Sequence, residues 1–395
     1  MSFRPIRALL AAIVIFLFAA PAFAQNPYVV ADVQTGAVLD HNRAFKRWYA
    51  ASVTKIMTAR LAFKAIRSGE LSMKSPVRMT ARAAKEPPSK MGYKVGTVLT
   101  MENALKIMLV KSANDVAMAV GEAVAGSEME FVAAMNEEAR AIGMTDTIYA
   151  NPNGLPGGTQ YTTARDQAIL AVRTRRDFPD YAGFFDLEAI DTGGHVIPNY
   201  NILLGRFAGA DGMKTGYVCA SGFNLAASAT RDGRTVVAIV LGAPSQNERA
   251  DLAADLLARG FATDPAGKPT LWTLEPYGDN RMQVANIRND ICTQAAQKAR
   301  YDGRDFDGKL VYRSSYLHPM NRAPVAVAVG TGGATGPAAA NTLVADVPVP
   351  TPRPDDAPQV ALTTPAQDQD QEEITSQLRG TPAPGIPVPT PRPSI

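Results

Sequence analysis

The sequence predicts an α+β fold in which an antiparallel β-sheet packs against helices and is joined to a helical subdomain. Three observations support this class: two short strands at the start of the folded region, a long helical middle, and three strands followed by a helix at its end. Strands at both ends of a helical middle favour one antiparallel sheet with flanking helices over repeated β-α-β units.

The first two strands are predicted in YVVADVQTGAVLDHN, residues 28–42, on either side of a Thr-Gly turn. Ser52 then opens a predicted helix, because the apolar residues that follow it recur at spacings of three and four. Two apolar helical stretches are predicted over residues 101–126, interrupted near Ser112. A further helix over residues 127–143 begins with a capping box.

After Asp211 the pattern of apolar residues changes from one typical of helices to one typical of strands. Residues 212–245 are typical of three strands, the last two of which are joined through Asp232-Gly233. A helix over residues 247–261 closes the domain. We therefore assign residues 25–265 to one folded domain, which carries the candidate catalytic motifs.

Residues 1–24 are predicted to be a secretory signal peptide. Two arginines precede an apolar run, and the segment ends in the small-x-small pattern Ala22-Phe23-Ala24. The apolar run is too short to be interpreted first as a membrane-spanning helix. The sequence therefore predicts an exported protein of the periplasm.

The C-terminal third has a different composition. Residues 266–322 form a short extension of mixed character, and residues 323–395 are rich in proline and alanine, with PVPTPRP occurring twice. Such a tail buries too little apolar surface to offset its ordering entropy, so we predict that it is disordered. Its prolines exclude a terminal amphipathic helix, and no clear membrane anchor is expected.

Composition excludes several classes of function. Removal of the signal takes away two arginines and no acid, which lowers the formal net charge from +3 to +1, so nucleic acid is a poor candidate partner. The widely spaced His41, His195 and His318 fit no metal-ligand pattern, so neither a metal nor another cofactor is expected, and a Ser-His-Asp triad is disfavoured. Cys219 and Cys292 permit one disulfide, which an oxidising periplasm favours over two free thiols.

Ser52 and Lys55 form an S-x-x-K motif that has two interpretations. A serine at a helix start commonly caps the helix, and the motif alone occurs by chance in chains of this length. A catalytic serine needs a base to take its proton, and a lysine three residues later can reach the hydroxyl. Such a lysine must lose its own proton, which burial and a second cation, for which Lys214 is the candidate, promote.

Two more motifs follow in order. Ser112-Ala113-Asn114 interrupts a helical region, where Ser112 can relay a proton to a leaving amine and Asn114 can hold substrate backbone.

Lys214-Thr215-Gly216 lies on a predicted strand, and Lys214 and Thr215 suit a ligand carboxylate. Gly216 lets a substrate backbone approach the strand edge, and the backbone N–H groups of Ser52 and Tyr217 can form an oxyanion hole.

Together the motifs resemble the penicillin-binding protein and serine β-lactamase superfamily. Within it, residues 28–261 resemble the low-molecular-mass serine D-alanyl-D-alanine carboxypeptidases of peptidase family S11. The resemblance rests on ASVTKIMTA, LVKSANDVAMA, NPNGL, DGMKTGY, GFNLAASATRDGR and LGAPSQNERADLAADLL. It implies a β-lactamase/transpeptidase-like fold.

The resemblance also implies the reaction, which is removal of the terminal D-alanine from peptidoglycan stem pentapeptides through an acyl-Ser52 intermediate. It makes Lys55 the general base and Ser112 the proton relay, and it makes β-lactam antibiotics inhibitors. Arg249 matches the family arginine that recognises the terminal carboxylate. The substrate-binding residues are then Asn114, Lys214, Thr215, Gly216, Tyr217 and Arg249.

Two alternatives stay open. A serine β-lactamase shares the motifs, but a class A enzyme needs a glutamate-positioned water, and no E-x-x-L-N segment lies between Asn114 and Lys214. A non-catalytic envelope scaffold would work through its proline-rich tail, and it would have no use for intact Ser52 and Lys55.

Overall fold

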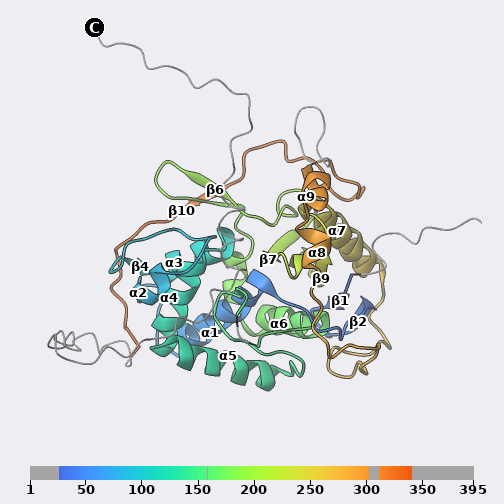
Figure 1. The fold of residues 1–395 in the computed structure, drawn as a ribbon, viewed down its shortest axis with the longest axis horizontal. Helices are drawn as coiled ribbons and strands as arrows, with labels where there is room; N and C mark the ends of the chain where they lie inside the picture. The colour runs from blue at the N-terminus through green and yellow to red at the C-terminus, as the bar shows by residue number, and fades with distance from the viewer. Residues whose placement is uncertain (1–25, 158, 302–310, 340–395) are drawn as a thin grey trace, which may run out of the picture.

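The computed structural model describes residues 26–157, 159–301 and 311–339. Within them a five-stranded antiparallel sheet in the order β2-β1-β9-β8-β7 lies beside a group of helices (Figure 1). This arrangement confirms the predicted α+β class. The strands are β1 (Tyr28–Asp32), β2 (Val38–Asn42), β7 (Ala210–Val218), β8 (Gly222–Arg231) and β9 (Arg234–Ala243).

Each face of the sheet has its own hydrophobic core, because alternate side chains of a strand point to opposite faces. On β9, Val237 and Ile239 pack with the helical group that includes α1 (Lys55–Arg67) and α6 (Ala164–Asp177). Val236 and Ala238 pack on the other face, with α7 (Gln246–Ala262). The sheet is therefore covered by helices on both sides.

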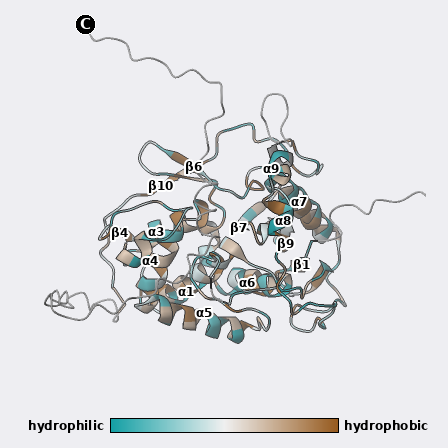
Figure 2. Ribbon diagram, viewed as in Figure 1, coloured by the Kyte–Doolittle hydropathy of each residue, from teal (hydrophilic) through white to brown (hydrophobic). Residues whose placement is uncertain are grey.

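The helical group consists of α1 and α6 with α2 (Ala81–Ala84), α3 (Met101–Val110), α4 (Asn114–Ala125) and α5 (Glu128–Ile142). The capping box is present, since Ser127 Oγ accepts a hydrogen bond of 3.1 Å from Glu130 N at the start of α5. Helix α5 alternates hydrophilic and hydrophobic residues along its length and buries Phe131, Met135 and Ile142 (Figure 2). The small strands β3 (Pro76–Arg78) and β4 (Val98–Thr100) pair with each other beside α3 and α4.

After α7 the chain continues along the domain. Thr270 forms an isolated bridge with Ala37, and the short helices α8 (Arg288–Ile291) and α9 (Gln294–Tyr301) follow. Before β7, a 3-10 helix η3 (Pro179–Phe184) leads into a hairpin of β5 (Ala189–Asp191) and β6 (Val196–Pro198).

We call residues 311–339 the strap, and its residues 323–339 differ from the sequence prediction of a disordered tail over residues 323–395. Strand β10 (Ala326–Ala328) pairs in parallel with β5, and Val329 N then donates to Asp191 O at 2.8 Å. Further on, Gly332 N donates to Val98 O at 2.7 Å. The prediction considered only the burial of apolar side chains, whereas backbone hydrogen bonds to the domain hold this segment.

No helix in the described ranges is both long and apolar enough to cross a membrane. The predicted signal peptide, residues 1–24, lies outside these ranges, and so do residues 340–395 of the predicted tail with both PVPTPRP repeats.

Candidate active site

Ser52 lies in a 3-10 turn, η2 (Ala51–Thr54), and not at the first position of the α-helix that the sequence predicted. Helix α1 begins at Lys55, and no side chain caps either helix start. In a 3-10 turn, residues three apart lie directly above one another, which places Ser52 beside Lys55. The Lys55 Nζ to Ser52 Oγ distance is 2.7 Å, so the serine contacts the lysine and is not a cap.

Two glycines pack against this turn from different segments. A Cβ at Gly216 on β7 would lie 2.8 Å from Ala50 O and 2.9 Å from Ser52 N. A Cβ at Gly154 would lie 1.9 Å from Ala51 O. Gly216 was predicted to admit a substrate backbone, and in the structure the absence of its side chain also admits the serine turn.

Lys55 is fully buried and its amine contacts three acceptors. Besides Ser52 Oγ, these are Asn114 Oδ1 at 2.8 Å and the backbone O of Asn153 at 2.9 Å. The last two oxygens cannot donate, because one is an amide carbonyl and the other a peptide carbonyl. When Lys55 is neutral, they take its two hydrogens, and its lone pair then faces the serine hydroxyl.

The surroundings of Lys55 favour this neutral form. Burial lowers the pKa of Lys55 well below its ordinary value, and the positive charge of Lys214 lowers it further. The carboxylates of Glu86 and Asp115 act in the opposite direction and raise it. The net shift is the one that a general base requires.

Ser112 joins α3 to α4 with a left-handed φ of 61°, and its hydroxyl faces the second lysine. Lys214 Nζ donates to Ser112 Oγ at 2.9 Å and to Thr215 O at 3.0 Å. Burial, followed by the charge of Arg249, lowers the pKa of Lys214 to about 7. The S-x-N and K-T-G motifs therefore meet through this lysine.

Asn114 has a different contact from the one predicted. Its Oδ1 accepts from Lys55, and its Nδ2 donates to Pro87 O at 3.0 Å. In the structure the Asn114 side chain thus orients the amine of Lys55. An amide nitrogen carries two hydrogens, so one remains for a substrate backbone.

The remaining predicted substrate residues lie on or near β7, which is an edge strand of the sheet. Thr215 is buried, whereas Tyr217 exposes 37% of its surface. Arg249 on α7 donates to the backbone oxygens of Asn224 and Tyr200 at 3.3 and 3.1 Å. Burial lowers the pKa of Arg249 to about 9, and its charge acts on Lys214.

Cys219 and Cys292 are joined by a disulfide with a Cα–Cα distance of 5.7 Å. It ties α8 to the chain just after β7. The Tyr217 hydroxyl lies 3.1 Å from Cys292 Sγ, so the bridge also contacts a side chain of the edge strand β7.

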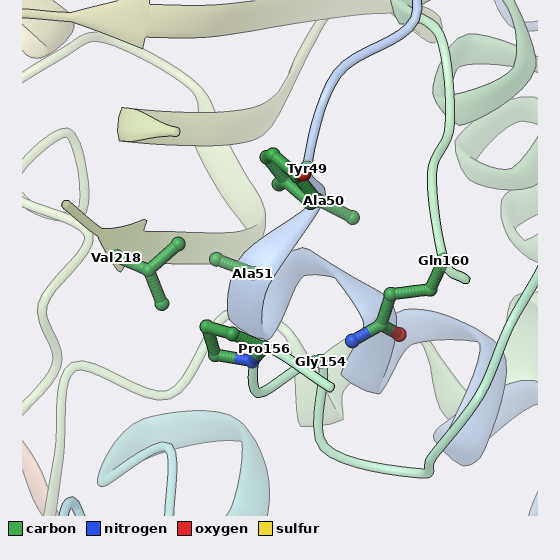
Figure 3. A pocket seen from close by; sticks show the side chains of 7 residues that line it. All are labelled: Tyr49, Ala50, Ala51, Gly154, Pro156, Gln160 and Val218. Carbon is green, nitrogen blue, oxygen red and sulfur yellow. The ribbon is translucent and has the colours of Figure 1, made fainter. Parts of the chain in front are cut away.

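A small pocket opens beside the serine turn, between the end of β7 and the loop after Asn153 (Figure 3). Gln160 projects into it from the loop side, opposite Val218. Its lining consists of Tyr49, Ala50, Ala51, Gly154, Pro156, Gln160 and Val218.

Sequence reasoning missed three residues that hold this site. Asn153 contributes a backbone oxygen to Lys55, and its only signal was its place in the NPNGL motif. Asn224 on β8 donates to Tyr49 O at 2.8 Å and so fixes the approach to the serine turn. Glu86 accepts from the Asn153 side chain, and no local pattern marks it.

The fold and the paired serine and lysine are those of the penicillin-binding class of proteins. The structure is similar to D-alanyl-D-alanine carboxypeptidase DacD from Francisella tularensis, with a TM-score of 0.58 and 31% identity over 63% of this chain and 73% of that one. It is equally similar to penicillin-binding protein 5 from Haemophilus influenzae, with a TM-score of 0.58 and 31% identity over 61% of this chain and 71% of that one.

Sequence comparison gives the family. Residues 16–245 match the peptidase S11 family, described as D-alanyl-D-alanine carboxypeptidase. The chain is 32% identical to DacF of Bacillus subtilis, and the match covers 62% of this chain and 68% of DacF. It is 30% identical to DacA of Haemophilus influenzae, and the match covers 74% of this chain and 82% of DacA. The chain belongs to the D-alanyl-D-alanine carboxypeptidase family, which confirms the predicted family and enzyme class.

Proposed function

We propose that this enzyme removes the terminal D-alanine from peptidoglycan stem pentapeptides through an ester on Ser52. The observation that carries the proposal is the 2.7 Å contact between Ser52 Oγ and Lys55 Nζ, with both other contacts of the amine made to obligate acceptors. This geometry aims a base at one hydroxyl and at no other group.

Acylation begins when Ser52 Oγ attacks the carbonyl carbon of the penultimate residue and its proton moves to Lys55 Nζ. The oxyanion that forms lies near the N–H groups of Ser52 and Tyr217, which stabilise it. The peptide C–N bond then breaks, and the proton that Lys55 took from Ser52 passes to the leaving amine through the hydroxyl of Ser112, which Lys214 holds. Free D-alanine departs, and the rest of the peptide remains as an ester on Ser52.

Deacylation repeats the steps in the opposite sense. Lys55 returns to the neutral amine, takes a proton from a water molecule, and the resulting hydroxide attacks the ester carbonyl. The bond to Ser52 Oγ breaks and the serine recovers a proton. The same base therefore serves both halves of the reaction.

Substrate recognition combines charge with strand addition. Lys214, Thr215 and Arg249 supply cationic and hydroxyl partners for the terminal carboxylate. Strand β7 is the last strand of the described sheet, and its outer edge would offer backbone groups to an extended peptide that lies beside it as an additional strand.

β-Lactams present a strained amide and a carboxylate to the same groups, so they are expected to acylate Ser52. Penicillin-binding protein D2 from Listeria monocytogenes has been solved in an ampicillin-bound form, and it is 28% identical to this chain with a TM-score of 0.53. The natural substrate is part of the cell wall, which is consistent with the predicted signal peptide and a periplasmic location.

The test is incubation of the purified protein with a stem pentapeptide, with released D-alanine as the readout and Ser52→Ala as the control. We expect release by the wild type only, and a penicillin adduct on Ser52 in mass spectrometry. An adduct on another residue would contradict the assignment. Rapid turnover of nitrocefin without D-alanine release would indicate a β-lactamase, and absence of any penicillin adduct would indicate a scaffold.

A further inference from the structure

A buried carboxylate outside the catalytic set is connected to the base by two hydrogen bonds. Glu86 is 4% exposed and follows helix α2. Its Oε2 accepts from Asn153 Nδ2 at 2.8 Å, and the backbone O of Asn153 accepts from Lys55 Nζ at 2.9 Å. Glu86 itself makes no contact with Ser52 or Lys55 in the hydrogen bonds of the described residues.

We propose that Glu86 is a positioning residue, which fixes the Asn153 carbonyl and thereby aims the amine of Lys55 at Ser52. The proposal rests on the function given above, in which Lys55 is the base.

The geometry supports this role because Asn153 is anchored through both side-chain atoms. Its Oδ1 accepts from Leu155 N at 3.0 Å, while its Nδ2 is held by Glu86. The next residue, Gly154, packs directly on Ala51 O of the serine turn. A shift of Asn153 would therefore move one of the three acceptors of Lys55 and the support of the nucleophile together.

Glu86 is itself held in place. Its Oε1 pairs with Arg82 one helical turn earlier, and Arg82 also pairs with Glu128 at 2.8 Å. With a cationic partner on one oxygen and an amide partner on the other, the Glu86 carboxylate has a fixed orientation. Glu128 shares the arginine with Glu86 but is not bonded to Asn153, which makes it a matched control.

The charge of Glu86 adds a second, separable effect. The charged groups that act on Lys55 are Lys214 from β7, Asp115 from α4 and Glu86 from the segment after α2. Asp115 is held by Met91 N and Gly92 N at 3.1 and 2.8 Å. Lys214 favours the neutral amine and the two carboxylates favour the ammonium, so loss of the Glu86 charge lowers the pKa of Lys55.

The experiment measures the second-order rate of acylation by a fluorescent penicillin as a function of pH for the wild type, Glu86→Gln, Glu86→Ala and Glu128→Gln. Glutamine retains an acceptor for Asn153 but has no charge. In Glu86→Gln we expect the acid limb of the profile to move to lower pH by about half a unit or more, with the plateau within about threefold of wild type. In Glu86→Ala the plateau should fall about tenfold or more, because the Asn153 support is lost.

Glu128→Gln should retain the wild-type profile. Unchanged profiles for both Glu86 variants would overturn the proposal, and so would an equal effect of Glu128→Gln. If Glu86→Ala does not fold, the shifted or unshifted acid limb of Glu86→Gln decides alone. Failure of the wild type itself to acquire penicillin on Ser52 would instead refute the proposed function.

Discussion

At the scale of single residues, the site depends on how the hydrogens of one amine are distributed. Asn114 and Asn153 accept from Lys55 through oxygens that have no proton to give, so only Ser52 can reverse its hydrogen bond. This arrangement explains why a lysine can act as base although it is usually protonated at neutral pH. The neighbouring charges influence the pKa of Lys55, whereas the two carbonyl acceptors determine the direction in which its amine points.

Lys55→Arg tests the need for a neutral amine. An arginine keeps the positive charge and part of the packing, but its guanidinium does not lose a proton in the accessible pH range. We expect acylation of Ser52 by penicillin to fall by about 1,000-fold or more, with a wild-type circular dichroism spectrum. Retention of labelling within about tenfold of wild type would show that another group takes the serine proton.

Arg249→Gln tests the coupling between the two buried cations of the substrate site. Burial lowers the pKa of Lys214 to about 7 together with a smaller contribution from the charge of Arg249, so removal of that charge should raise the pKa. If protonated Lys214 binds the substrate carboxylate, kcat/KM declines as pH rises through that pKa, and the variant should show this decline at higher pH. The measurement is the kcat/KM profile for D-alanine release. The plateau of kcat/KM should also fall in Arg249→Gln, while acylation by penicillin is partly retained. If the decline of kcat/KM at high pH occurs at the same pH as in the wild type, the charge of Arg249 does not act on Lys214.

At the scale of elements, the sequence patterns identified the strands of the main sheet, the helices α1, α3, α4, α5 and α7, and the order of the three motifs, because each depends on a local period or spacing. Helix α6 was not predicted. The 3-10 turn at Ser52 was not foreseen, because its shape depends on Gly154 and Gly216, which are distant in sequence. The contact of Glu86 with Asn153 was missed for the same reason. Spacing identified the candidate catalytic residues, and long-range packing determines how their side chains are oriented.

The link between β7 and α8 gives the prediction that belongs to this scale. Cys219 and Cys292 are 73 residues apart, and closing such a loop stabilises the folded chain by about 4 kcal/mol in the chain-entropy model. We expect the Cys219→Ser/Cys292→Ser variant to lose about 2 to 4 kcal/mol of unfolding free energy in urea titrations. The unreduced wild type, once denatured, should show no free thiol, and two thiols per chain would rule the link out.

At the scale of the whole molecule, the strap connects parts of the domain that are far apart in sequence. Near its start, Arg313 N and Ser314 N donate to Asp251 Oδ1 on α7 at 3.0 and 3.1 Å. Near its end, Gly336 N donates to Lys74 O at 2.9 Å, next to β3. The strap thus joins the helix that covers one face of the sheet to the helical group (Figure 1).

Truncation tests the strap. A chain that ends at residue 322 lacks β10, so hydrogen exchange at Ala189–Asp191 should become about tenfold faster or more, while β8 and β9 exchange as before. A chain that ends at residue 339 keeps every strap contact described above and serves as the control. Equal protection of β5 in both truncated chains would show that β10 adds no stability there.

Gly154 and Gly216 pack against the serine turn from two sides, and this packing affects which substitutions the protein tolerates. The nearest contacts of both glycines are made to main-chain atoms of residues 50–52, so Ser52 is located mainly by backbone against backbone. Most substitutions of neighbouring side chains leave these backbone contacts in place. A methyl group added at either glycine, in contrast, would displace the serine turn. The surrounding pocket can therefore diversify toward new ligands while the position of the reactive oxygen stays the same.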